Sequence, residues 1–410
     1  LRDSEMAARR QFLHAVAANL ANESRQLLTN YDRSTSYRLA DFAGQYVAPG
    51  PNPACLQALF DAWYYVPPNQ TGEENEREFQ VPFCYQIDYD LGRNVQARFG
   101  KRGKSLILYA FSPSNHTLYS WDAESHKPGK PVLIEEGFER FDISPDGSTL
   151  LFISENSLQF WRSQSDIFRL NVANINRYCF SASGDEFLYF DENESKVFAL
   201  ELRNAYAQRK GEQRATPRLL LSNWYDEVLG MAYHEGRIWL GGRDSLTVLQ
   251  RAGKETQWQI ETSLHWGHTA AYATDLQLFP SQQAAFLSNA QGAVHMKLTV
   301  SGGLPQSVEQ GRVFKGTTLA TRQDAALLAQ AQTDRELLYL LTVDSSFTRH
   351  GAFLHPGEEF TFMNGAFSPD GKWFAAATDT GILKLWALAE LQSDAGVSLF
   401  GSVRSVFSQD

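Results

Sequence analysis

The fold is decided by a stretch close to the C-terminal end of the sequence, FSPDGKWFAAATDTGILKLW at residues 367–386. Its apolar runs are short and are separated by two turn signals. In Ser-Pro-Asp-Gly at 368–371, proline presets φ and glycine accepts a positive φ, while Asp379-Thr380-Gly381 is typical of a hairpin. The stretch therefore predicts three consecutive antiparallel strands. Trp386 ends the third strand, where a large side chain can fill the gap between two sheets.

The same layout recurs upstream at a regular distance. Clear copies begin at FGKRG (99–103), ISPDG (143–147) and FSASG (180–184), and weaker ones at YHEG (233–236), FPS (279–281) and TRQD (321–324). The third strands of the units then reach, at spacings of 39 to 49 residues, Trp121, Trp161, Leu200, Leu249, Met296, Leu341 and Trp386. Repeats of this length, built from short strands and turns, are typical of a β-propeller. The sequence predicts an all-β, seven-bladed β-propeller, with six or eight blades as alternatives.

These units resemble the WD40 repeat family over about residues 81 to 390. The Trp-Asp pair of that family is kept at Trp121-Asp122, and its Gly-His pair is kept at Gly267-His268. The resemblance implies a ring of blades in which one strand from outside the repeats closes the circle. Residues 80–89, ahead of the first blade, are one candidate for that strand, and residues 396–407 of the tail are the other.

The N-terminal part follows a helical pattern. Apolar residues recur at helical spacing from Glu5 to Leu28, then from Leu39 to Val47, and again after Asn52-Pro53, a capping asparagine followed by proline at the first helical position. We expect a small α-helical segment at 1–68, an acidic linker at 69–80, the propeller at 81–395 and a C-terminal tail at 396–410.

The helical segment resembles the region that joins the ATPase and the WD40 repeats in bacterial STAND-type signalling proteins. That resemblance implies an ATPase domain upstream, with the propeller as the sensor. The sequence starts at Leu1 and not at methionine, which fits a longer parent chain.

Composition excludes several classes of function. The net charge of −10 and the pI of about 5.5 disfavour binding to nucleic acid, because an acidic chain repels phosphates. The three cysteines lie far apart without a C-x-x-C pair, which disfavours a disulfide framework and a structural zinc site. No apolar run is long enough to cross a membrane. We expect a cytoplasmic protein without a membrane partner.

Three motifs imitate catalytic or metal sites and fail as such. Residues 100–105, GKRGKS, lack the glycine that a phosphate-binding loop needs at position 98, where Arg98 stands, and they precede a strand. Asp379-Thr380-Gly381 has no second copy to complete an aspartic-protease pair. His265 and His268 supply half of a zinc site. We therefore expect no catalytic residue, no metal and no cofactor.

The candidate binding residues follow from position in the ring. Residues just before each innermost strand surround the mouth of the central channel. They are Arg140, Asn176, Glu227, Tyr272, Lys315 and Phe362. Their mixture of charge, amide and aromatic groups suits recognition of a protein surface or a peptide.

The leading hypothesis is a non-catalytic, protein-binding sensor propeller that contacts the upstream domain of its own polypeptide. One alternative is a propeller enzyme, a hydrolase or an oxidoreductase, with its site at the channel mouth. The other alternative is a standalone scaffold for protein complexes.

Overall fold

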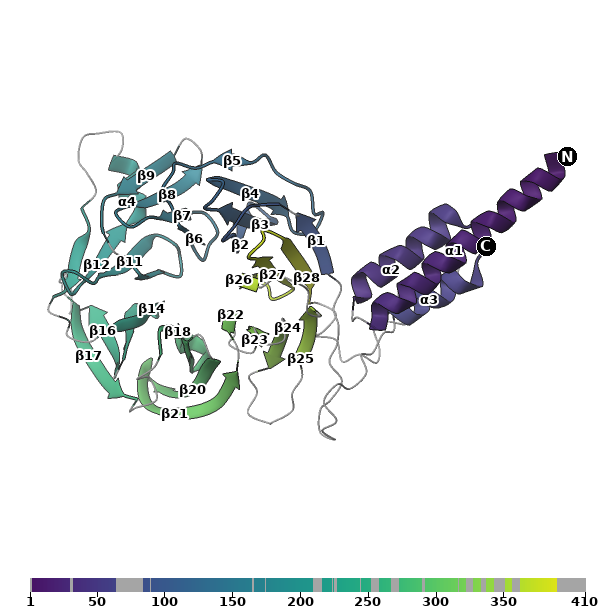
Figure 1. Cartoon of the computed structure of the whole chain (residues 1–410). Helices are drawn as coiled ribbons and strands as arrows, with labels where there is room; N and C mark the ends of the chain where they lie inside the picture. The colour runs from purple at the N-terminus through teal and green to yellow at the C-terminus, as the bar shows by residue number, and fades with distance from the viewer. Residues whose placement is uncertain are drawn as a thin grey trace.

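The computed structural model describes residues 2–29, 32–63, 84–88, 90–163, 166–173, 175–208, 216–222, 224, 227–243, 245–251, 258–266, 273–289, 292–315, 317–321, 327–332, 337–342, 351–355 and 362–388. The sheets are arranged in a ring, and a bundle of helices lies to one side of it (Figure 1). Among the helices in these ranges, none is both long enough and apolar enough to cross a membrane.

The described strands form seven antiparallel sheets of four strands each, which are the blades of the ring. Blade 1 holds β2 (Gln96–Arg102), β3 (Ser105–Ser112), β4 (Thr117–Asp122) and β5 (Val132–Leu133). Blade 2 holds β6 (Arg140–Ile143), β7 (Leu150–Ile153), β8 (Leu158–Ser163) and β9 (Asp166–Leu170). Blade 3 holds β10 (Arg177–Phe180), β11 (Glu186–Asp191), β12 (Lys196–Glu201) and β13 (Arg218–Leu221). Blade 4 holds β14 (Val228–His234), β15 (Arg237–Gly242), β16 (Ser245–Arg251) and β17 (Trp258–His265).

The last three blades complete the ring. Blade 5 holds β18 (Asp275–Phe279), β19 (Ala284–Asn289), β20 (Gly292–Ser301) and β21 (Leu304–Lys315). Blade 6 holds β22 (Thr317–Thr321), β23 (Leu327–Gln332), β24 (Leu337–Thr342) and β25 (Gly351–His355). Blade 7 holds β26 (Phe362–Phe367), β27 (Trp373–Thr378) and β28 (Leu383–Ala387), with β1 (Cys84–Asp88) as its outermost strand. The predicted all-β, seven-bladed architecture is confirmed.

The ring is closed by a strand from the N-terminal side. Strand β1 pairs antiparallel with β28, with Cys84 opposite Trp386 and Tyr85 opposite Leu385. Of the two candidates named from the sequence, residues 80–89 therefore supply the closing strand. The rival tail at 396–407 lies outside the described residues, as do the expected acidic linker at 69–80 and Gly267-His268.

The core consists of layers between neighbouring blades. The seven residues predicted at the end of each unit all fall in the third strand of a blade. Trp386 is fully buried and packs against Phe362 and Phe374, at ring-centroid distances of 6.0 and 5.7 Å, and its cluster includes residues of blade 6. Trp121 packs in the same way into a cluster shared by blades 1 and 7. Each tryptophan fills the gap between two sheets, as the sequence predicts.

The turns between first and second strands are built from local hydrogen bonds. In blade 2, the hydroxyl of Ser144 donates to Asp146 (2.5 Å) and accepts from the amide of Thr149 (2.9 Å). Blade 7 repeats these bonds with Ser368, which donates to its own turn aspartate and accepts from the amide of Trp373. The motif at 100–105 forms the hairpin between β2 and β3, in which Arg102 lies opposite Ser105.

Four helical elements precede the ring in the described ranges 2–29 and 32–63. Helix α1 (Arg2–Thr29) is followed by α2 (Arg33–Phe42), by a π-helical turn η1 (Ala43–Val47) and by α3 (Pro53–Trp63). The predicted cap at Asn52 is confirmed, because its side chain accepts from the amide of Ala54 (3.0 Å). At the start of α2, the side chain of Asp32 accepts from the amide of Thr35 (3.0 Å). The first turns of α1 project beyond the bundle (Figure 1).

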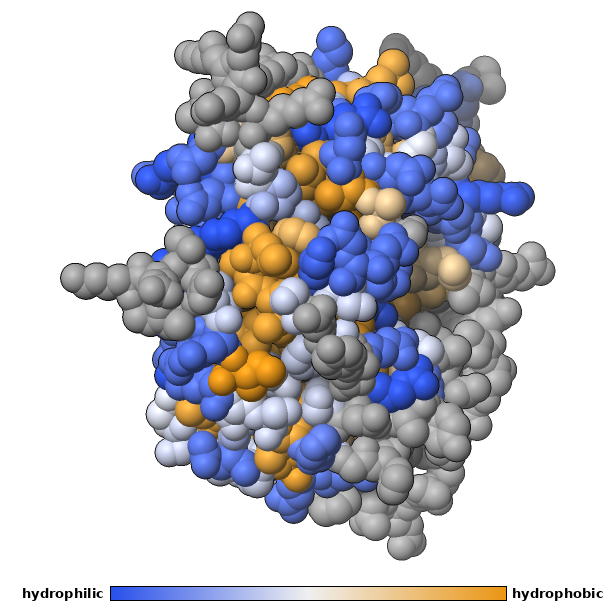
Figure 2. Space-filling view, turned by 90° about the vertical axis from the view of Figure 1, so that its left-hand side faces the viewer, coloured by the Kyte–Doolittle hydropathy of each residue, from blue (hydrophilic) through white to orange (hydrophobic). Residues whose placement is uncertain are grey.

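The bundle has a core of small residues, and part of its apolar surface is exposed. Its buried cluster is Ala17, Ala21, Ala40, Ala43, Cys55 and Ala58, so the helices approach closely. Within the described part of the ring, two short helical elements also occur, α4 (Leu202–Gln208) and the 3-10 turn η3 (Pro280–Gln282). On the outer wall of the ring, apolar side chains gather between hydrophilic ones (Figure 2). Outer strands β13 and β17 contribute the exposed Leu219 and Ile260.

Candidate binding site at the channel mouth

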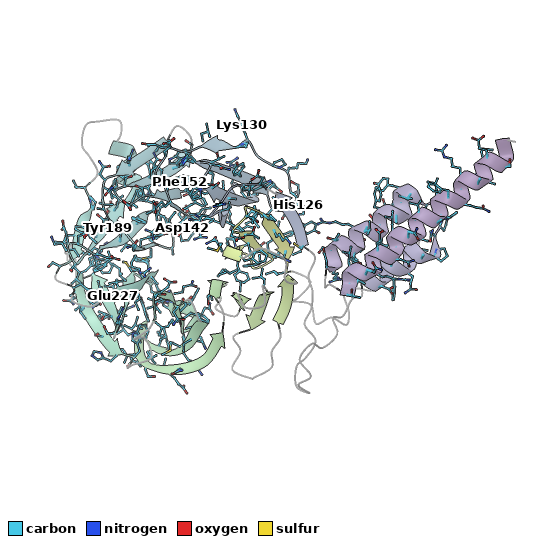
Figure 3. The ribbon with its side chains drawn as sticks, viewed as in Figure 1. His126, Lys130, Asp142, Phe152, Tyr189 and Glu227 are labelled. Atoms are coloured by element: carbon cyan, nitrogen blue, oxygen red, sulfur yellow. The ribbon has the colours of Figure 1, made fainter. Side chains whose placement is uncertain are left out.

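The innermost strands all begin at the same end of the ring. Because the strands of each blade alternate in direction, the turns between second and third strands lie at that end too, whereas the turns between first and second strands lie at the other. We call the end at which the innermost strands begin the mouth face, and it includes Asn176 and Glu227. The opposite end, where the turns between first and second strands lie, is the far face, and it includes Lys104 and Glu124. Asp142 lies on the side of its blade that faces the centre of the ring (Figure 3).

A chain of polar contacts runs around the channel through four blades. Arg98 of blade 1 donates from Nε to Asp142 of blade 2 (3.1 Å) and from Nη1 to Asn364 of blade 7 (3.1 Å). The hydroxyl of Tyr178, in blade 3, donates to the other oxygen of Asp142 (3.0 Å). Burial and the neighbouring Asp142 carboxylate raise the pKa of Tyr178 well above its usual value, so the hydroxyl stays protonated and keeps donating.

Two arginines at the start of innermost strands hold neighbouring blades together. Arg140, the first residue of β6, is half-buried and donates from Nη2 to the carbonyl of Ile175 in the next blade. Arg177, the first residue of β10, donates to the carbonyls of Val228 (3.1 Å) and Thr274 (2.8 Å). It therefore bridges blade 3 to blades 4 and 5. These guanidinium groups fix the shape of the mouth.

Two of the predicted residues are exposed at the mouth face. Asn176 immediately precedes β10 and donates to the carboxylate of Glu192 (3.3 Å). Glu227 immediately precedes β14 and pairs with Arg243 at 2.7 Å, in an ion pair whose side chains are 45% and 58% exposed. Exposed ion pairs of this kind exchange readily with water and with new partners. Asn176 and Glu227 are thus accessible to a partner.

Phe362 does not lie at the surface, which corrects the expectation for this residue. It is the first residue of β26, yet only 4% of its surface is exposed, and it packs on Trp386. The pairing of β26 with β27 shifts register between Phe362 and Asn364, and Met363 between them is 53% exposed. The bulge turns the phenylalanine into the core and the following methionine outward.

The remaining two predicted residues are only partly placed. Tyr272 lies outside the described residues. Lys315 is the last residue of β21, opposite Gly292 in β20, and so belongs to the outermost strand of blade 5. Its backbone stands two residues before β22, near the expected position, and its side chain lies outside the described part of the chain.

The sequence reasoning missed the residues that organise the mouth, namely Arg98, Asp142, Arg177, Tyr178 and Asn364. A signal for some of them exists. Strand β2 carries polar residues at the alternate positions Gln96 and Arg98, and β6 does so at Arg140 and Asp142. Such alternation places both side chains on one side of the strand, and Gln96 indeed bonds to the backbone of Glu139 and Phe141 in blade 2.

Metal-binding residues do not gather within the described ranges. No group of three or more histidine, cysteine or acidic residues there could hold a metal ion. The three cysteines are free thiols. Burial raises the pKa of Cys84 and of Cys179 to about 12, which keeps both protonated and poorly nucleophilic at neutral pH.

Comparison with known proteins identifies the fold. No protein-family model and no curated protein sequence matches the chain. Among solved structures, it is similar to the β-propeller domain of Cps50 (Swd1) from Myceliophteria thermophila, with a TM-score of 0.55 and 13% identity. That match covers 74% of this chain and 99% of the other. In all, 1266 solved chains match. A shared fold does not by itself determine which ligand is bound.

Proposed function

We propose that this β-propeller binds a protein or a peptide on its mouth face, without catalysis of its own. The observation that carries the proposal is a mouth whose polar groups are held in place from blade to blade by Arg98, Arg140 and Arg177. Fixed side chains lose little conformational entropy when a partner binds. The exposed Asn176 and Glu227 stand on this rigid frame.

We further propose that the propeller is the sensor part of a larger cytoplasmic signalling protein of the bacterial STAND type. Its support is the resemblance of the helical segment, with helices α1 to α3 preceding the ring. In this proposal a ligand at the mouth face shifts the equilibrium of the upstream domain by binding one of its states more tightly. The standalone scaffold differs from the sensor only in lacking that upstream partner.

The enzyme alternative gains no support from the described residues. A propeller hydrolase or oxidoreductase needs carboxylates, histidines or metal ligands that converge on the channel. Two carboxylates on innermost strands are instead held by side chains of other blades: Asp142 by Arg98 and the Tyr178 hydroxyl, and Asp275 by Arg177. These contacts connect blades.

The binding proposal is tested by capturing partners from host lysate on the purified chain and identifying them by mass spectrometry. The variants are Asn176→Ala with Glu227→Ala on the mouth face. The matched controls are Lys104→Ala and Glu124→Ala in exposed turns of the far face. We expect a protein that both the wild type and the controls retain and that the mouth-face variant loses. Equal retention by all three chains would place binding elsewhere and contradict the proposal.

The sensor proposal has a separate test. The parent polypeptide is expressed in full, and its ATP hydrolysis is measured with and without the captured partner. We expect the partner to change the rate of hydrolysis, and the mouth-face variant to abolish that change. A parent protein with no nucleotide-hydrolysing domain would rule out the sensor proposal and leave the scaffold.

A further inference from the structure

We infer that helix α2 is a latch on the ring: it holds the free edge of the closing strand β1, so that the position of the helical bundle and the closure of the propeller are coupled. This inference rests on the fold and on contacts between the two parts. It stands whether or not the mouth face binds a partner.

The closing strand has an edge that its own sheet does not satisfy. As the outermost strand of blade 7, β1 pairs with β28 along one side. Alternate residues of such a strand point their amide and carbonyl groups away from the sheet, where they need other partners. Cys84 is a residue of this kind. Its amide and its carbonyl group both form hydrogen bonds with helix α2.

Helix α2 supplies both partners. The hydroxyl of Ser34 accepts from the amide of Cys84 (2.5 Å), and Nη2 of Arg38 donates to the carbonyl of Cys84 (2.7 Å). Ser34 and Arg38 are four residues apart and therefore lie on one face of the helix. Ser34 is only 7% exposed, so the contact at the serine is shielded from water.

The same arginine also reaches the seam where the ring closes. Its guanidinium lies 5.4 Å from the ring centroid of Tyr85, within range of a cation–π attraction. Tyr85 in turn packs on His126 of the β4–β5 turn in blade 1 (4.4 Å) and on Trp373 of blade 7 (6.3 Å). His126 lies at the edge of the ring nearest the helices (Figure 3). Helix α2 thus contacts the strand whose side chains join the last blade to the first.

The contacts make the coupling reciprocal. If the bundle moves away, Cys84 loses two hydrogen-bond partners and Tyr85 loses its cation, so the pairing of β1 with β28 becomes easier to open. By linkage, anything that opens the seam weakens the hold on α2 by the same factor. A force or a ligand that acts on the helices is therefore transmitted to the seam between blades 1 and 7.

Hydrogen exchange measured by mass spectrometry on the full chain tests the latch. The variants are Ser34→Ala, Arg38→Ala and the double substitution. One lost hydrogen bond should speed exchange of the peptides covering 84–88 and 383–387 about five-fold, and both losses about thirty-fold. Thr35→Ala, an exposed position on the same helix, is the matched control and should leave these peptides unchanged. Peptides of β11 in blade 3 should exchange at the wild-type rate in every variant.

Two outcomes would overturn the inference. One is a double variant whose β1 peptide exchanges like the wild type, which would mean that α2 adds nothing to closure. The other is equal acceleration in β1 and β11, which would indicate general destabilisation. Circular dichroism at 222 nm verifies that the helices remain folded. Tyr85→Ala provides the reciprocal test, because it should speed exchange in α2 while Thr35→Ala does not.

Discussion

Substitution of Gly147 by alanine tests how closely the far-face turn of blade 2 approaches strand β2 of blade 1. Gly147 lies in the turn between β6 and β7 with φ of +72°, a value that side-chain-bearing residues rarely adopt. A Cβ atom there would meet the backbone nitrogen of Lys101, in blade 1, at 2.4 Å. Gly103 is the matched control, because it has a φ of +64° in the equivalent turn of blade 1 and nothing lies within 4 Å of its added Cβ.

The magnitudes follow from these two environments. A left-handed backbone costs alanine about 1–2 kcal/mol, and the smaller entropy of the unfolded variant offsets about 0.4–1 kcal/mol of that. Gly103→Ala should therefore lower the free energy of unfolding by about 1 kcal/mol. Gly147→Ala adds the overlap with backbone that cannot rotate away, about 1–3 kcal/mol more.

Urea unfolding followed by tryptophan fluorescence measures both variants. The difference between them isolates the contact between blades 1 and 2, since the backbone penalty is common to both. We expect Gly147→Ala to be less stable than Gly103→Ala by at least about 1 kcal/mol. Equal losses of stability would refute the reasoning, because they would mean that the turn at Gly147 does not closely contact the backbone of Lys101.

Three further predictions concern an arginine that joins blades, a core tryptophan and the aspartate of one turn. Arg177→Ala should lower the free energy of unfolding by about 2–3 kcal/mol, because charge-assisted bonds to two blades are lost. Arg243→Ala removes an exposed ion pair and should lower that free energy by less than about 0.5 kcal/mol. Urea unfolding measures both variants. Trp386→Ala should cost about 3–5 kcal/mol, measured in the same way, and a loss below that of Arg243→Ala would contradict its place in the core. Burial alone would raise the pKa of Asp146, yet hydrogen bonds from Ser144 and Ser148 hold that pKa below its ordinary value. Its contribution to stability is therefore present above the ordinary pKa of about 3.9 and is lost as the pH falls through the lowered one. Asp146→Asn should show a flatter fall in stability between neutral pH and roughly pH 3 than the wild type.

The blades could be predicted because their signals are local. A turn such as Ser144-Pro145-Asp146-Gly147 is fixed by its own hydrogen bonds and by a glycine that accepts positive φ. The apolar runs on either side then become strands with a defined pairing. Their regular spacing placed Trp121 and Trp386 in the third strands before any contact between blades was known.

The roles at the channel mouth could not be predicted in the same way. Arg140 stands where the sequence placed it, but its partner is a carbonyl 35 residues away, and no local pattern indicates that distance. Phe362 was assigned to the surface because it opens an innermost strand. A bulge of one residue reversed which side chain faces outward. The position of a residue along a strand can be predicted from the sequence. The side of the sheet to which its side chain points depends on pairing with residues far away in the sequence.

The pairing of β1 with β28 has a consequence for synthesis of the chain. Cys84–Asp88 leaves the ribosome long before Leu383–Ala387, its partner in the last blade. At about 5–20 residues per second, the roughly 300 intervening residues take about 15 to 60 seconds to make. For that time the nascent strand has no sheet to join, and six blades can form ahead of it. Closure of the ring is then a late step that joins residues far apart in the sequence. A ribosome stalled before residue 383 would carry an unclosed ring, whose exposed strand edge can pair with another chain.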